Sequence, residues 1–290
     1  MKTLHVWWLI LAATIAVLPG CGDDSEPTGT GGQPPPVPPA ATVSPDLTLF
    51  TSPLALELAG VAGAPSDTFG QCDTTMWNFA NAAVRVVPVT AGVAAIVVPA
   101  AAALAGAAGV TPALEDGGWF VYGYTISYEG YAIELELRAK WDRANDAIDY
   151  EMYATTEIWS HAVEDWLWYT GECAEDLTEG IWTFHIPALE DTVLVSKPFV
   201  ETDWEWNSAT DMTALFTIVA PDTVIHDDTI EYDRLGTWIQ MEVHDASTSL
   251  SGTAAWDLET QGGWLQFPNY REGAKACWSE SGCDTACPHY

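Results

Sequence analysis

From residue 118 onward, apolar and polar residues alternate with a period of two in a series of short segments. In YAIELELRA (residues 131–139), Ile133, Leu135 and Leu137 share one side, and charged residues occupy the other. DAIDYEMYA repeats the pattern, and the polar residues between the two segments favour a turn. Such alternation is typical of antiparallel strands with one buried face. About ten to twelve such segments follow one another over residues 117–268, which predicts a large antiparallel β-meander, either a curved sheet or an up-and-down barrel.

An uncharged, alanine-rich stretch over residues 86–114 precedes these strands. It is long enough to span a bilayer, but alanine contributes little transfer free energy, and Pro88, Pro99 and Pro112 interrupt the stretch. We therefore expect a mainly β (α+β) fold in which short apolar helices within residues 72–110 pack on the meander. A membrane span and a surface-inserting hairpin are the alternatives. The spacing predicts three helices, over residues 73–87, 90–98 and 100–108.

The first twenty residues have the pattern of a signal peptide. Lys2 is followed by an apolar run over residues 6–17, as in secreted proteins. The run ends in Leu18-Pro19-Gly20-Cys21, which resembles the lipobox of bacterial lipoproteins. The resemblance implies cleavage before Cys21 and attachment of a diacylglycerol, with acyl chains such as palmitate. It places the chain in the cell envelope, and Gly22 favours the outer membrane. An ordinary signal peptide and an N-terminal membrane helix are the alternatives.

The residues after Cys21 have the composition of a linker. Gly, Pro, Ser, Thr and acidic residues dominate up to residue 41 and bury too little apolar surface to fold. No second linker follows, so a single globular domain is expected. The predicted organisation is a signal peptide (1–20), a lipidated cysteine with a disordered tether (21–41) and the domain (42–290), which comprises apolar helices (72–110), the meander (117–268) and a cysteine-containing C-terminal loop (269–290).

The charge of the chain is strongly negative. Without residues 1–20 there are eight Lys and Arg against 41 Asp and Glu, a net charge of −33. Nucleic acid is excluded as a partner because no basic patch exists to neutralise phosphates. Anionic lipid would repel the domain too, so a lipid anchor would have to hold it at the membrane. The acidity indicates either solubility in a salty medium or the binding of cations.

Five cysteines remain after Cys21. Outside the cytoplasm they are expected to pair, and their odd number leaves one thiol over. The sequence does not determine the pairing. The three C-terminal cysteines with His289 would suit zinc only in a reducing compartment, so a disulfide-held loop is favoured there. The candidates for disulfides are Cys72, Cys173, Cys277, Cys283 and Cys287.

Three segments carry a further resemblance. A helical Asn81-Ala82-Ala83, a proline-broken apolar stretch and Trp-rich strands containing DWLWYTGE and GIWTF resemble an uncharacterised group of secreted bacterial lipoproteins, over about residues 72–270. The group has no established activity, so the resemblance implies location and shape but no catalytic residue. In outline, the order of helices and strands is also similar to periplasmic carriers of lipoproteins and lipids.

No catalytic motif is present. The sequence lacks the G-x-S-x-G elbow, HExxH, the Walker A loop and the dinucleotide fingerprint. Carboxylates are abundant, but no pair is singled out for glycoside hydrolysis. Two pairs of indoles, Trp166/Trp168 and Trp204/Trp206, each alternate onto one face of a strand. If these indoles lie in a core, they contribute only to its packing. If they lie on an open face, they would bind a sugar or an acyl chain.

The best candidate for a metal is the segment DTVIHDDTIEYD. Oxygen-rich loops suit Ca²⁺, although the spacing matches no known calcium loop and a solvated charge run is the simpler interpretation. No other cofactor is predicted. The candidate ligands are Asp222, His226, Asp227 and Asp228.

These observations predict a lipid-anchored envelope protein without enzymatic activity. The leading hypothesis is a binding module for a hydrophobic or glycan ligand, held in a cup lined by Trp. The alternative is a structural or protein-contacting lipoprotein whose own helices close the sheet face. A hydrolase is the third and weakest hypothesis. The first two differ in whether the helices fill the sheet's concave face or leave a cavity there.

Overall fold

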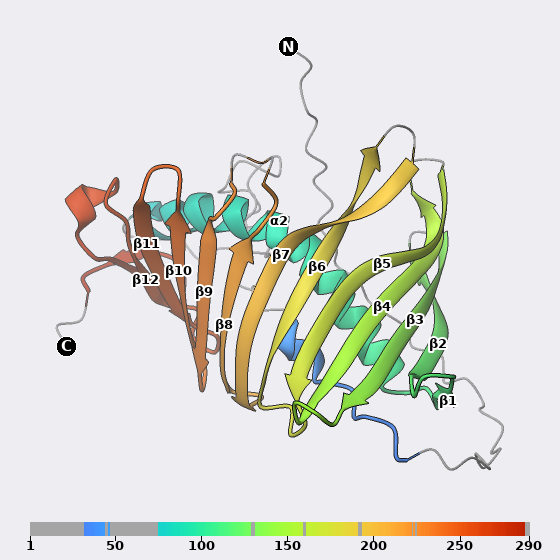
Figure 1. Cartoon of the computed structure of the whole chain (residues 1–290). Helices are drawn as coiled ribbons and strands as arrows, with labels where there is room; N and C mark the ends of the chain where they lie inside the picture. The colour runs from blue at the N-terminus through green and yellow to red at the C-terminus, as the bar shows by residue number, and fades with distance from the viewer. Residues whose placement is uncertain are drawn as a thin grey trace.

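The computed structural model describes residues 32–43, 46, 75–128, 131–158, 161–190, 193–221, 223 and 225–287. These residues form one antiparallel sheet of fourteen strands, arranged in sequence order, with a long helix across one face (Figure 1). The sheet is open, and β1 and β14 are its edges. The predicted mainly β fold with an antiparallel meander is confirmed, and of the two forms the curved sheet is the one observed.

Eleven strands, β2 to β12, fall in the region predicted as the meander, while β13 and β14 lie in the C-terminal loop. The described elements are η1 (Ala40–Thr42), α2 (Trp77–Ala107), β1 (Ala113–Leu114), β2 (Phe120–Tyr128), β3 (Tyr131–Asp142), β4 (Ala147–Ile158), β5 (His161–Ala174), β6 (Glu179–Glu190), β7 (Val193–Ser208), β8 (Asp211–Ile218), β9 (Thr229–Leu235), β10 (Trp238–Asp245), β11 (Leu250–Asp257), β12 (Gly263–Gln266), η2 (Arg271–Gly273), β13 (Ala276–Trp278) and β14 (Asp284–Thr285).

The apolar stretch forms one helix of 31 residues, α2, and not the three short helices predicted from its prolines. Pro88 and Pro99 each remove one backbone donor, but the helix continues because it packs on the sheet on both sides of them. Its first half contacts β12 to β14 and its second half contacts β2 and β3, where the Tyr124 hydroxyl donates to the Ala103 carbonyl. Within the described residues, no helix is long and apolar enough to cross a membrane.

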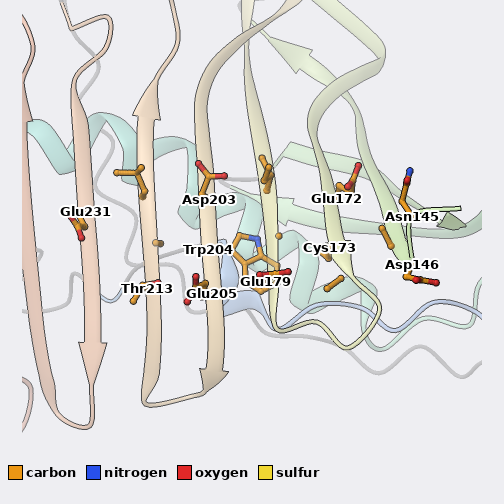
Figure 2. A pocket seen from close by; sticks show the side chains of 16 residues that line it. Asn145, Asp146, Glu172, Cys173, Glu179, Asp203, Trp204, Glu205, Thr213 and Glu231 are labelled. Atoms are coloured by element: carbon orange, nitrogen blue, oxygen red, sulfur yellow. The ribbon is translucent and has the colours of Figure 1, made fainter. Parts of the chain in front are cut away.

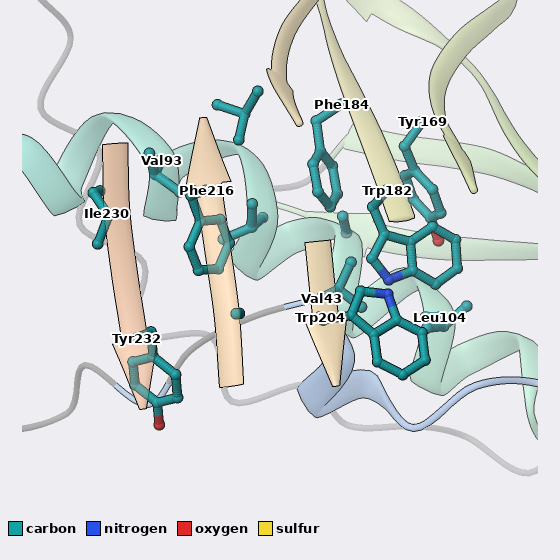
Figure 3. Packing of buried hydrophobic residues seen from close by; sticks show 14 of the residues in the cluster. Val43, Val93, Leu104, Tyr169, Trp182, Phe184, Trp204, Phe216, Ile230 and Tyr232 are labelled. Atoms are coloured by element: carbon teal, nitrogen blue, oxygen red, sulfur yellow. The ribbon is translucent and has the colours of Figure 1, made fainter. Parts of the chain in front are cut away.

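The inner face of the sheet, defined as the face that packs on α2, carries the core. Buried aromatic rings from β5 to β9 meet buried side chains of α2 such as Val93 and Leu104 (Figure 3). Three of the indoles lie over glycines of the neighbouring strand. Gly171 is directly opposite Trp182, Gly180 is opposite Trp204, and Gly263 is opposite Trp278. A glycine under each ring leaves room for a large aromatic side chain between two strands.

Residues 32–43 lie against this core, although residues up to 41 have the composition of a tether. The Tyr122 hydroxyl donates to the Pro35 carbonyl over 2.9 Å, and the Tyr150 hydroxyl donates to the Pro36 carbonyl over 2.6 Å. Val43 is fully buried. Proline carbonyls accept hydrogen bonds as well as others do, so tyrosines of the inner face hold a segment whose composition alone would leave it extended and solvated.

The N-terminus of α2 is capped from a distant strand. Within the described residues the helix has no side-chain cap of its own at Met76. The Asp284 carboxylate on β14 instead accepts hydrogen bonds from the Asn78 backbone N–H, at 2.8 Å, and from the Thr75 hydroxyl. A carboxylate at this position also interacts favourably with the helix dipole.

Replacing Asp284 by Ala is therefore expected to lower the free energy of unfolding by about 0.5–2 kcal/mol, the usual range for a lost N-cap. Urea denaturation monitored by tryptophan fluorescence measures this change. Asp284→Asn, which keeps an acceptor but no charge, is expected to retain part of the stability. An unchanged midpoint for Asp284→Ala would contradict the proposed capping role.

The described cysteines agree with the expectation of disulfide pairing with one thiol left over. Cys277 and Cys287 form a disulfide, which confirms that a disulfide holds the C-terminal loop, and Cys283 is disulfide-bonded as well. Cys173 on β5 is a free, buried thiol, and burial raises its pKa well above the usual range. Cys21 and Cys72 lie outside the described residues.

We expect Cys173 to resist alkylation in the native protein, because only an exposed thiolate reacts readily. Peptide mapping after iodoacetamide treatment is expected to find Cys173 unmodified without denaturant and modified in urea. Rapid modification of the native protein would contradict the buried position of this thiol.

Candidate functional site

A groove of about 710 Å³ crosses the outer face of the sheet, opposite to α2. It runs over β4 to β9, with the turn between β3 and β4 at one end (Figure 2). Six carboxylates line it, and none of its described lining residues is Lys, Arg or His. The acidic lining residues are Asp146, Glu172, Glu179, Asp203, Glu205 and Glu231.

The strand register arranges five lining residues in one row across the sheet. Each residue lies directly opposite the next on the neighbouring strand, and carboxylates alternate with aliphatic side chains. Neighbouring strands lie about 4.8 Å apart, so the carboxylates, which occupy alternate strands, recur about every 10 Å. The row is Glu172 (β5), Ile181 (β6), Asp203 (β7), Leu215 (β8) and Glu231 (β9).

The aliphatic members of the row are open to solvent. The exposed fraction is 48% for Ile181 and 38% for Leu215. On an outer strand face in water, polar residues are the usual occupants. Two exposed aliphatic side chains between carboxylates therefore offer apolar contact to a ligand that also carries positive charge.

A second pair of carboxylates reinforces the negative potential. Glu179 and Glu205 lie directly opposite each other on β6 and β7, an arrangement of like charges that destabilises a sheet. Beside the groove on β9, partial burial and the neighbouring Glu231 raise the pKa of Asp233. The folded protein thus maintains a concentration of negative charge that a bound cation would relieve.

The basic side chains lie elsewhere. All eight that follow the predicted signal peptide are within the described residues, and none lines the groove. Each contacts a carboxylate or an aromatic ring at another site. They are Arg85, Arg138, Lys140, Arg143, Lys197, Arg234, Arg271 and Lys275.

The four tryptophans predicted as a ligand cup are not brought together on an open face. Trp204 is buried beside Trp182 in the core (Figure 3), 2% exposed, and Trp206 is half-buried. Trp166 and Trp168 stack on each other with ring centroids 6.3 Å apart and are half-buried against the core. Helix α2 and residues 32–43 occupy the inner face where the cup was expected.

The predicted metal ligands do not converge in the described part of the chain. Asp222 lies outside the described residues. The buried Asp228 carboxylate accepts a hydrogen bond from the Ala246 backbone N–H over 2.9 Å, which fixes a loop, and His226 lies 3.5 Å from the Asp227 carboxylate. Among the described residues, no group of three or more His, Cys, Asp or Glu side chains is placed to hold a metal ion.

Sequence reasoning missed the groove as a site. Asp203 and Glu205 alternate with Trp204 along the sequence, and this pattern predicts only that they face the solvent. Their relation to Glu172 and Glu231 depends on the pairing of five strands. Comparison with known protein families, curated proteins and solved structures gave no match.

Proposed function

We propose that this chain is an exported, lipid-anchored envelope protein without enzymatic activity, and that its acidic groove binds a linear organic polycation. The observation that carries the proposal is the row in which carboxylates alternate with exposed aliphatic side chains across β5 to β9. The lipid anchor rests on the lipobox that ends in Cys21.

The chemistry of the row is complementary to a polyamine. Such a molecule is a chain of ammonium groups separated by short alkyl segments. Ammonium groups would pair with Glu172, Asp203 and Glu231, while the alkyl segments would lie on Ile181 and Leu215. A volume of about 710 Å³ falls within the range of about 300–1,000 Å³ typical of small-molecule sites.

The packing of the inner face favours this proposal over the Trp-lined cup. A hydrophobic or glycan ligand on the inner face would have to displace α2, which supplies a large part of the core. One observation also supports the alternative of a protein-contacting lipoprotein. A protein segment with both basic and apolar side chains offers the same positive charges and apolar contacts as a polyamine.

Isothermal titration calorimetry with spermine tests the proposal on the purified chain. We expect saturable binding that weakens as salt is added, because both partners are charged. Mg²⁺, added so that the total concentration of positive charge is the same, is the control for simple charge neutralisation. We expect Mg²⁺ to bind more weakly than spermine because it makes no apolar contact. Equal affinities for spermine and Mg²⁺ would contradict the proposal. Tighter binding of a lysine- and leucine-containing peptide than of spermine would favour the protein-contacting alternative.

A further inference from the structure

Helix α2 carries an apolar stripe on the side that faces away from the sheet. Trp77 is 64% exposed, Val84 is 44% exposed and Val98 is 37% exposed, and Ala105 is also exposed. Successive members of this set are seven or fourteen positions apart, so they lie on one side of the helix. The residues that α2 buries against the sheet, such as Val86 and Val97, lie on the opposite side.

The stripe carries no charge. Arg85 is the only charged residue of α2, and its guanidinium lies over the rings of Phe267 and Tyr270 and donates to Asn81. A helix that is apolar all round is normally covered on both sides. The sheet covers one side of α2, which leaves the stripe as a surface suited to an apolar neighbour.

The chain enters the domain on the same side of the sheet. Residues 32–43 lie on the inner face, and η1 contacts α2. Gly32 follows Cys21 by only eleven positions, which span at most about 40 Å when fully extended. A lipid on Cys21 would therefore hold the α2 side close to the bilayer. The acidic groove lies on the other face of the sheet.

We propose that the stripe of α2 rests on the lipid surface to which Cys21 is anchored, so that the acidic groove points away from the membrane. The helix lies along the interface and does not cross the bilayer. A surface rich in zwitterionic lipid suits this contact, because the strongly acidic domain is repelled by anionic headgroups. This inference rests on the lipid anchor of the proposed function and is independent of the ligand in the groove.

The test uses the lipidated full chain, reconstituted into vesicles of phosphatidylethanolamine and phosphatidylcholine. Val84→Cys and Val98→Cys are labelled with a nitroxide, and Thr125→Cys, an exposed position on β2 away from the groove, is the matched control. We expect the two helix labels to become more accessible to oxygen and less accessible to a water-soluble nickel complex on reconstitution. We expect no change for the control label.

Flotation of the same vesicles separates the two proposals. Protein that does not float overturns the anchor, and the inference about α2 falls with it. Protein that floats while the helix labels stay as accessible to nickel as the control overturns the inference alone. Labels that lose accessibility to both reagents and show dipolar coupling at high protein density would also overturn it, because they would indicate a second copy of the chain on the stripe.

Discussion

Asp203→Lys is expected to weaken spermine binding about tenfold. Asp203 is the central carboxylate of the row, flanked by Ile181 and Leu215 and two strands from both Glu172 and Glu231. The substitution removes an attractive contact and adds a repulsive one at the centre of the groove. A single exposed ion pair contributes about 0.2–1 kcal/mol, and reversing its sign doubles the change to about 0.4–2 kcal/mol, a range that includes the 1.4 kcal/mol of a tenfold effect.

The matched control is Glu134→Lys. It changes the net charge of the protein by the same amount, and Glu134 is exposed on β3, outside the groove. Calorimetry with spermine on both variants is expected to show a large loss of affinity for Asp203→Lys and a small one for Glu134→Lys. Equal losses of affinity in the two variants would mean that spermine binding depends only on the net charge of the protein. That result would contradict the groove as the binding site.

Gly171→Ala is expected to lower the free energy of unfolding by about 1–3 kcal/mol, the usual cost of overpacking a core. The added methyl group would overlap with the ring of Trp182, which lies directly over Gly171 from the neighbouring strand. Trp182 is fully buried against Tyr150 and Tyr169, so the ring has little room to move away. Urea denaturation of the purified variant measures the loss.

Gly123→Ala is the control for this effect. Gly123 is an exposed strand glycine on β2, and no atom lies within 4 Å of the position of an added Cβ. Its replacement is expected to leave stability unchanged or to raise it slightly, because alanine restricts the unfolded chain. If Gly171→Ala were as stable as Gly123→Ala, the glycines beneath the indoles would have no packing role.

The meander was predictable because its signal is local. Alternation in residues 131–139 and in the segments that follow assigns one face of each strand to the core, whatever the partner strands are. The length of α2 was not predictable from local rules. Pro88 and Pro99 indicate breaks when the stretch is considered alone, and only the contacts of the helix with β2, β3 and β12 to β14 keep it continuous.

The candidate site was hidden for a related reason. The row from Glu172 to Glu231 joins residues that are 59 positions apart in sequence, and it exists only in one register of five strands. Bulges in β5 and β7 interrupt the pairing of these strands with their neighbours, and their positions depend on packing between strands. The prediction of a ligand cup from the indole pairs was limited by a different property of the sequence. Alternation assigns Trp204 to one face of its strand, but it does not show whether α2 covers that face.

A crystal structure of the chain soaked with spermine tests the binding site most directly. We expect extended spermine to lie across β5 to β9, with ammonium groups beside Glu172, Asp203 and Glu231 and its alkyl segments over Ile181 and Leu215. Spermine bound at another surface, or an empty groove at a concentration that saturates the protein in solution, would contradict the assignment of the groove as the binding site.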